Sequence, residues 1–218
     1  MALSALLKQK TPITGCGRTD AGVHASQFFF HFDFEGYLDK EKLKFKLNSF
    51  LPEDIAIFRV IKVKGEAHAR FSAISRSYQY RMSLGKNVFQ NELSFVIPGI
   101  KLDLDLMNQA GSIIMEYSDF KCFSKSKTDV KTYECVISEA CWKQDGADLT
   151  FHITGNRFLR NMVRAIVGTM IEIGKGKMTL KQFRDVIESR DRTRAGASVK
   201  AWGLYLSQVS YPNEIFIQ

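Results

Sequence analysis

Residues 148–174 read DLTFHITGNRFLRNMVRAIVGTMIEIG, a short alternating segment followed by a longer apolar one. In the first part, apolar side chains stand at every second position, at Leu149, Phe151 and Ile153, which predicts a half-buried strand. In the second part, apolar residues recur at spacings of three and four, which predicts an amphipathic helix over residues 158–173. Together, the strand and the helix predict a helix packed on a sheet.

The neighbouring segments extend this pattern in both directions. Upstream, residues 132–142 predict a second strand, and the linker KQDGA predicts a hairpin between the two strands. Downstream, Thr179 is a candidate cap for a helix that ends near Arg190. Further strands are expected at residues 13–19, 26–34, 55–63, 77–84 and 201–211, and further helices at residues 39–51 and 104–115.

The order of these elements indicates the fold class. Strands and helices mix without the strict alternation of a parallel sheet, which favours an α+β fold with helices layered on mainly antiparallel sheet. A boundary near the segment EAHARFSA divides the chain into an N-terminal half, residues 1–69, and a C-terminal half, residues 70–218. This joint is not rich in proline or glycine, so we expect the two halves to pack closely.

Composition limits the partners of the chain. The 218 residues carry a net charge of +8, and an excess of this sign favours a polyanionic partner, nucleic acid first. The four cysteines form no C-x-x-C pair and the four histidines show no ligand spacing, so we expect no metal. Reduced thiols are typical of a cytoplasmic protein. No apolar run reaches the length of a membrane span, so no membrane is expected as a partner.

The glycine-rich stretch GCGRTDAGVHA, residues 15–25, places a charged pair on a turn. Asp20 precedes Ala21 and Gly22, where the backbone can turn sharply. One interpretation is an Asx-turn, in which the Asp20 side chain binds a nearby N–H group. The other is a carboxylate held on a rigid turn as a nucleophile or base. The stretch has no Gly-Lys-Ser/Thr, so it does not predict a phosphate loop.

Cationic side chains recur on the predicted helix. One side of it carries Arg157, then Arg160 or Asn161, then Arg164 and Gly168, spaced by three and four. This side is either a solvated basic surface or a phosphate-binding surface, in which Arg157 and Arg160 contact the RNA backbone. Gly168 would let this side approach something closely.

The segment RSYQYR, residues 76–81, places two tyrosines among cations. Tyr78 and Tyr80 point to one face of the predicted strand. Either both rings pack into the core, or a ring stacks on a nucleobase while a neighbouring arginine binds phosphate.

Four segments together resemble one family. GCGRTDAGVHA, HARFSAISRSYQYR, NRFLRNMVRAIVGTMIEIG and KAWGLYL, in this order, are similar to the TruA family of tRNA pseudouridine synthases. The resemblance implies the pseudouridine synthase fold, in which two ferredoxin-like-related α/β halves with mainly antiparallel sheet form a central RNA-binding cleft. It implies isomerisation of uridine to pseudouridine at positions 38–40 of the tRNA anticodon stem-loop. It also implies a homodimer that uses no cofactor and no metal.

The resemblance implies a role for five residues. Asp20 matches the catalytic aspartate, which attacks the nucleotide at the ribose or at the uracil ring. Arg18 matches the basic residue of the same loop. Tyr78 matches the tyrosine that stacks on the target uracil, Arg164 the arginine that pairs with the catalytic carboxylate, and Leu204 the apolar residue that lines the pocket. An ionised carboxylate in a partly dry pocket needs such a positive neighbour.

The start of the chain departs from the family pattern. The family opens with a strand and a Tyr-Asp-Gly…Gly-Trp-Gln segment, and here only the tail of the following helix, ALSALL, is recognisable. The chain is then a truncated gene model, a fragment, or a member that compensates through dimer contacts. Two other functions stay open: a non-catalytic RNA-binding protein derived from this fold and inactivated by the missing segment, and a nucleotide-metabolising enzyme. The absent phosphate loop counts against the latter.

Overall fold

The structure is a computed structural model that describes residues 2–125 and 130–217. The chain forms two compact units, each made of segments distant in sequence. Unit 1 comprises Met1–Arg18, Phe29–Ala73 and Tyr211–Gln218, and unit 2 comprises Thr19–Phe28 and Ile74–Ser210. The turn that carries Asp20 and the predicted arginine helix therefore belong to the same unit, unit 2.

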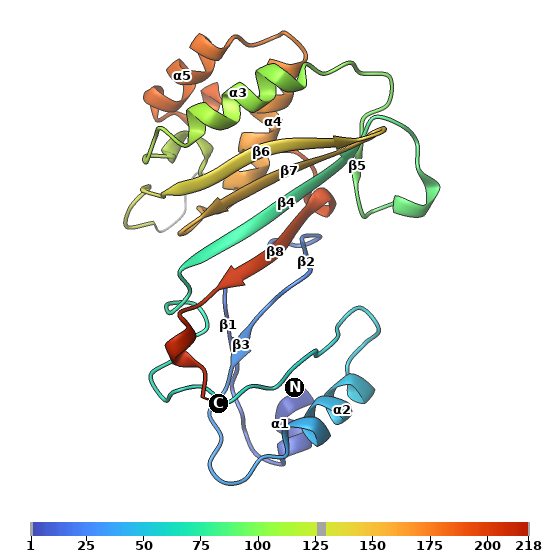
Figure 1. The fold of residues 1–218 in the computed structure, drawn as a ribbon, viewed down its shortest axis with the longest axis vertical. Helices are drawn as coiled ribbons and strands as arrows, with labels where there is room; N and C mark the ends of the chain where they lie inside the picture. Colours follow the sequence, from blue (N-terminus) through green and yellow to red (C-terminus); the bar gives the residue numbers. More distant parts are fainter. Residues whose placement is uncertain (1, 126–129, 218) are drawn as a thin grey trace. The chain divides into compact units, whose positions relative to one another are not determined.

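A six-stranded sheet forms the centre of unit 2 (Figure 1). Its strands are β2 (His24–Ala25), β4 (Ser75–Ser83), β5 (Phe95–Val96), β6 (Ile137–Asp145), β7 (Asp148–Gly155) and β8 (Leu204–Ser210). The order is β2-β8-β4-β7-β6, and β5 pairs with β4. The long pairs β4–β7, β4–β8 and β6–β7 are antiparallel, whereas the two-residue strands β2 and β5 pair in parallel. The predicted α+β class with mainly antiparallel sheet is confirmed.

The β6–β7 hairpin forms where the alternating pattern predicts it. Gly146 takes the positive φ of 57° that the tight turn requires. Leu149, Phe151 and Ile153 of β7 are fully buried and belong to the main hydrophobic core. The outward residues of this strand are only half-buried, so the hydrophobic alternation places one face of the sheet against the core.

Two helices, α3 (Leu104–Ile114) and α4 (Met162–Gly174), cover the buried face of this sheet, and α5 (Leu180–Ser189) packs against α3 (Figure 1). Asp103 caps α3 by accepting a hydrogen bond from the Leu106 N–H. Thr179 caps α5 in a reciprocal capping box with Gln182, as the sequence predicts. Short 3-10 turns complete the chain at Val88–Gln90, Lys121–Phe123, Arg192–Arg194, Ala201–Gly203 and Asn213–Ile215.

The predicted helix over residues 158–173 begins four residues later than expected. Asn161 adopts a left-handed backbone with φ of 67°, and α4 starts at Met162. Asparagine tolerates this conformation better than most residues, and its side-chain amide donates to the Ser198 hydroxyl at 2.6 Å. The prediction that Arg157, Arg160 and Arg164 share one helical face is therefore wrong, because only Arg164 lies in the helix.

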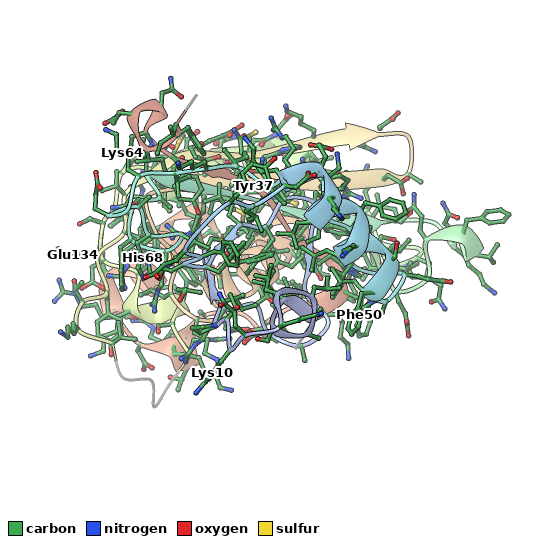
Figure 2. All side chains as sticks on the ribbon, turned by 90° about the horizontal axis from the view of Figure 1, so that it is seen from below. Lys10, Tyr37, Phe50, Lys64, His68 and Glu134 are labelled. Atoms are coloured by element: carbon green, nitrogen blue, oxygen red, sulfur yellow. The ribbon has the colours of Figure 1, made fainter. Side chains whose placement is uncertain are left out.

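Unit 1 contains α1 (Ala2–Leu7), α2 (Lys40–Phe50) and a two-stranded sheet of β1 (Thr14–Gly15) and β3 (Phe30–His31). Asp39 caps α2 by accepting a hydrogen bond from the Lys42 N–H. The buried side of α2 packs Leu43 and Leu47 against Leu3. Phe50, the last residue of the helix, is exposed (Figure 2).

The predicted strand over residues 55–63 does not form. Val63 makes only an isolated bridge to Phe216, and no strand pairs with residues 55–62 in the part of unit 1 that the structure describes. The side-chain amide of Asn48 instead donates to the Ile57 carbonyl at 2.9 Å and accepts from the Ile57 N–H at 2.7 Å. β-branched residues favour an extended backbone, but a strand also needs a neighbour for its N–H and C=O groups.

None of the helices within residues 2–125 and 130–217 is long and apolar enough to cross a bilayer.

Candidate active site

Asp20 lies at the first position of a tight turn. Its backbone carbonyl accepts from the Val23 N–H at 3.1 Å, and Gly22 takes a φ of 78°. This positive φ is the conformation for which glycine is favoured. The chain then enters β2, which pairs in parallel with β8 at the edge of the sheet. The turn is thus fixed to the sheet directly after the aspartate.

A ring contact also holds β2, the strand that follows the Asp20 turn. The His24 imidazole stacks on the Tyr205 ring with centroids 4.7 Å apart, and its Nε2 lies 3.0 Å from the Glu92 carbonyl oxygen. The Tyr205 hydroxyl donates to the neighbouring Leu93 carbonyl at 2.7 Å. The strand after Asp20 is therefore held by side chains as well as by backbone pairing.

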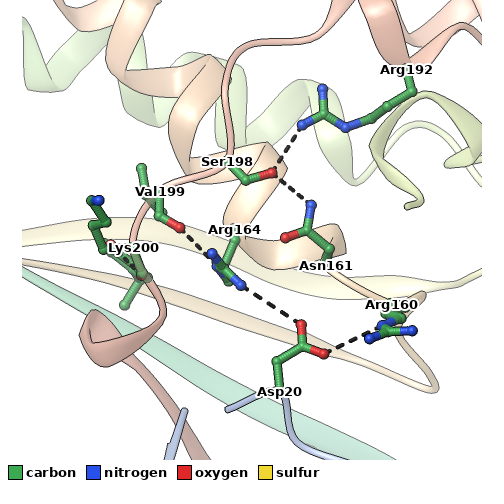
Figure 3. A network of polar contacts seen from close by, with 9 residues as sticks. Asp20, Arg160, Asn161, Arg164, Arg192, Ser198, Val199 and Lys200 are labelled. Carbon is green, nitrogen blue, oxygen red and sulfur yellow. Dashed lines mark hydrogen bonds and ion pairs between the residues drawn. The ribbon is translucent and has the colours of Figure 1, made fainter. Parts of the chain in front are cut away.

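The Asp20 carboxylate lies between two guanidinium groups (Figure 3). Its Oδ1 is 3.4 Å from Arg160 Nε, and its Oδ2 is 3.7 Å from Arg164 Nη1. Within the described residues, these arginines are the only partners of the carboxylate. The side chain therefore does not form the Asx-turn that was one interpretation of this stretch. Each oxygen of the carboxylate instead faces one positive charge.

Arg164 is held rigidly against the loop that follows η3 (Arg192–Arg194). Its Nε donates to the Val199 carbonyl at 2.7 Å, and its own carbonyl accepts from the Val199 N–H at 3.2 Å. Only 21% of the side chain is exposed. Because Nε is used in this way, the end of the guanidinium is directed at Asp20 (Figure 3).

This loop lies directly on α4. A Cβ at Gly168 would come within 1.8 Å of the Ala197 carbonyl oxygen, closer than any real contact. Gly196 donates its N–H to the Thr169 hydroxyl at 2.9 Å. Gly168 therefore does allow a close approach, as its position in the sequence suggests, and the approaching group is backbone of the same chain.

A second set of polar contacts supports the same loop. The Ser198 hydroxyl accepts from Asn161 Nδ2 at 2.6 Å and from Arg192 Nη2 at 2.9 Å (Figure 3). Arg192 also donates to the carbonyls of Ala195 and Gly196. Sequence reasoning missed Arg192 and Ser198 and the contact of Asn161 with them, because polar side chains that meet across long separations leave no periodic pattern.

The two tyrosines of β4 lie in different environments. Tyr80 is fully buried, and its hydroxyl donates to the Lys200 carbonyl at 2.9 Å. This burial raises the pKa of Tyr80 well above its usual value, against the opposing effect of the Arg164 charge. Tyr78 is only half-buried, and its ring makes a T-shaped contact with the Phe158 ring, with centroids 5.1 Å apart. Tyr80 is a core residue, whereas part of Tyr78 remains accessible.

The other predicted site residues lie as follows. Leu204 is buried at the start of β8, where it pairs with Tyr80. Arg157 donates to the backbone carbonyls of Thr132 and Glu134, away from the carboxylate. Arg18 is exposed and belongs to unit 1.

The structure thus brings Asp20, Arg160 and Arg164 together, with Tyr78 contacting the segment that carries Arg160. Within the described ranges, no group of three or more histidine, cysteine, aspartate or glutamate side chains could hold a metal ion. The site therefore consists of a fixed carboxylate between two guanidinium groups, close to a partly accessible tyrosine ring. Such an arrangement suits a covalent reaction on a ring-bearing, phosphate-bearing substrate.

Comparison with known proteins gives one family. A family model described as tRNA pseudouridine synthase matches residues 117–212. The tRNA pseudouridine synthase A of Parabacteroides distasonis is 49% identical over 216 residues, which cover 99% of this chain and 85% of the relative. The protein of the same name from Bacteroides thetaiotaomicron is 49% identical, with 99% and 81% covered. That from Bacillus pumilus is 37% identical, with 97% and 87% covered. This chain belongs to the tRNA pseudouridine synthase family.

Proposed function

We propose that this chain isomerises uridine to pseudouridine in tRNA, with Asp20 as the nucleophile. The observation that carries the proposal is the Asp20 carboxylate, fixed on a tight turn between two guanidinium groups. The family membership supplies the substrate. The target positions, 38–40 of the anticodon stem-loop, come from the resemblance to the TruA family and form the finer part of the proposal.

The reaction rearranges bonds within one nucleotide. The bond between the ribose C1′ and the uracil N1 breaks, the base turns, and a bond forms between C1′ and C5. The proton on C5 leaves and N1 gains one, so the product is an isomer and nothing is oxidised or reduced. Asp20 attacks the nucleotide, at the ribose or at the uracil ring, to open this sequence.

The neighbouring residues have supporting parts in this proposal. Arg164 orients the carboxylate, because the Val199 carbonyl fixes the guanidinium that faces it. The accessible part of the Tyr78 ring stacks on the uracil, and Leu204 lines the pocket. Arg18 and Arg157 add positive charge for the RNA backbone, in a chain with a net charge of +8.

Mapping of pseudouridine tests the function directly. The purified chain is incubated with an unmodified tRNA transcript, and pseudouridine is located by chemical labelling and primer extension. We expect new pseudouridine at positions 38–40 and none in a transcript with cytidine at these positions. RNA binding without any pseudouridine would instead favour a non-catalytic RNA-binding protein.

Replacement of Tyr78 tests the stacking role. Tyr78→Ala should weaken tRNA binding by about 1–3 kcal/mol, because a stacked aromatic ring contributes about this much per base. Tyr78→Phe keeps the ring and should retain most of the binding. Fluorescence titration with labelled tRNA measures both. Wild-type affinity and turnover in Tyr78→Ala would show that the ring only packs against Phe158.

We further propose that the protein is a cytoplasmic homodimer, as the resemblance implies. Unit 1 offers physical support, because it exposes large apolar side chains that a partner could cover. They are Tyr37, Phe45, Phe50, Phe58 and Phe71. Figure 2 labels Tyr37 and Phe50. Light scattering at micromolar concentration should report about twice the mass of one chain. A particle of 24.8 kDa would contradict the dimer.

A further inference from the structure

The two arginines that face Asp20 differ in how they are held. Arg164 lies within α4, and its Nε hydrogen bond to the Val199 carbonyl fixes the guanidinium. Arg160 lies in the turn before the helix, and 57% of its side chain is exposed. Within the described residues, Asp20 is the only partner of the Arg160 guanidinium. Arg160 can therefore leave the carboxylate without breaking any other hydrogen bond or ion pair that the described residues make with its side chain.

A carboxylate that attacks a nucleotide needs one free oxygen. The reacting atoms must come within about 3–3.5 Å of each other, which excludes a side chain between them. Here Oδ1 faces Arg160 and Oδ2 faces Arg164. Arg164 could uncover Oδ2 only by losing its bond to Val199, whereas rotation of the exposed Arg160 side chain uncovers Oδ1.

A substrate would offer Arg160 a new partner. Arg160 lies two residues after Phe158, whose ring is in a T-shaped contact with the Tyr78 ring. A nucleotide stacked on Tyr78 therefore brings its phosphates toward the segment that carries Arg160. A guanidinium group binds phosphate oxygens in a bidentate geometry, which makes a phosphate a strong competitor for the carboxylate.

We propose that Arg160 exchanges partners when RNA binds. In the free protein it pairs with Asp20, and in the complex it binds a phosphate of the RNA and leaves Oδ1 open. Arg160 is in this view a positioning residue with two partners, while Arg164 stays on Asp20 throughout. The inference rests on the proposed function for the identity of the RNA, and the binding test below needs no turnover.

A double-mutant cycle tests the exchange by affinity alone. Dissociation constants are measured for the wild type, Asp20→Asn, Arg160→Gln and the double variant, with tRNA that already contains pseudouridine, so that no reaction occurs. Asp20→Asn should tighten RNA binding about two- to five-fold, because the exposed ion pair between Asp20 and Arg160 is lost and no longer competes with the RNA phosphate for Arg160. In the Arg160→Gln background, Asp20→Asn should leave the affinity unchanged.

Arg157→Gln is the matched control. It removes the same charge from the same segment, but Arg157 contacts backbone carbonyls and not Asp20. Asp20→Asn should tighten binding in this background as it does in the wild type. Equal tightening in the Arg160→Gln background, or no tightening in any background, would overturn the exchange. Thermal melts of all variants show that each is folded.

Kinetics give a second readout. Arg160→Gln should raise KM several-fold and keep kcat within about two-fold, because Arg160 has left Asp20 before the chemical step. A kcat as low as that of Arg164→Gln would mean that Arg160 acts on Asp20 in the reacting complex, and would also overturn the proposal. If the wild type forms no pseudouridine, the proposed function fails, and the binding cycle still decides whether Arg160 exchanges.

Discussion

Asp20→Asn should fold, bind tRNA and form no pseudouridine above background. Asparagine keeps the size of the side chain and its place on the turn, but it removes the attacking charge. No second carboxylate lies on residues 15–25 to replace it. We expect the rate to fall by about three orders of magnitude or more, as is usual when a nucleophile is removed. Pseudouridine formed per unit time by the full chain measures the loss.

Asp119→Asn is the matched control for this variant. Asp119 also pairs with an arginine, Arg190, at 3.1 Å, and its side chain is 29% exposed, against 31% for Asp20. It takes no part in the proposed site, so its activity should stay near that of the wild type. Appreciable pseudouridine formation by a folded Asp20→Asn protein would remove Asp20 as the nucleophile.

Gly168→Ala should reduce both stability and activity. The added Cβ would lie 1.8 Å from the Ala197 carbonyl oxygen, so either α4 or the loop at residues 195–199 must shift. Overpacking of this kind costs about 1–3 kcal/mol of the free energy of unfolding. A shifted loop also moves the Val199 carbonyl, which orients Arg164, so kcat should fall beyond the loss of folded protein. Denaturant unfolding and tRNA turnover measure the two effects.

Gly65→Ala provides the comparison. A Cβ at Gly65 would meet nothing within 4 Å, so neither stability nor turnover should change by much. If Gly168→Ala unfolds at the same denaturant concentration as the wild type, the loop moves without cost and does not fix Arg164.

Local features of the fold could be predicted from the sequence. The alternation in β7 and the cap of α5 depend on neighbours within a few residues, and both appear in the structure as expected. The start of α4 could not be predicted, because the left-handed Asn161 depends on its contact with Ser198, which is distant in sequence. The strand prediction for residues 55–63 was wrong for a similar reason. These residues favour an extended backbone locally, but no neighbouring strand among the described residues pairs with residues 55–62.

In the candidate site, too, local features could be predicted and long-range contacts could not. The glycine pattern around Asp20 predicted a turn, but it left the function of the carboxylate open until the family resemblance was considered. Nothing local to Arg160 indicates that it would meet a residue 140 positions away. The prediction that Arg160 contacts RNA came from its charge and its helical spacing, and neither distinguishes one anionic partner from another. Long-range ion pairs are set by the folded chain as a whole.

The place of β8 in the sheet has a consequence for biosynthesis. Among the residues that the structure describes, β2, which follows Asp20, pairs only with β8, and β8 is the last strand to be made. At about 5–20 residues per second, the ribosome needs roughly 10–40 s to pass from the aspartate to this strand. During that interval the turn that carries Asp20 has no strand to pair with. A nascent chain that stalls before Leu204 would already contain Asp20, Tyr78 and Arg164, but the Asp20 turn would not yet be attached to the sheet.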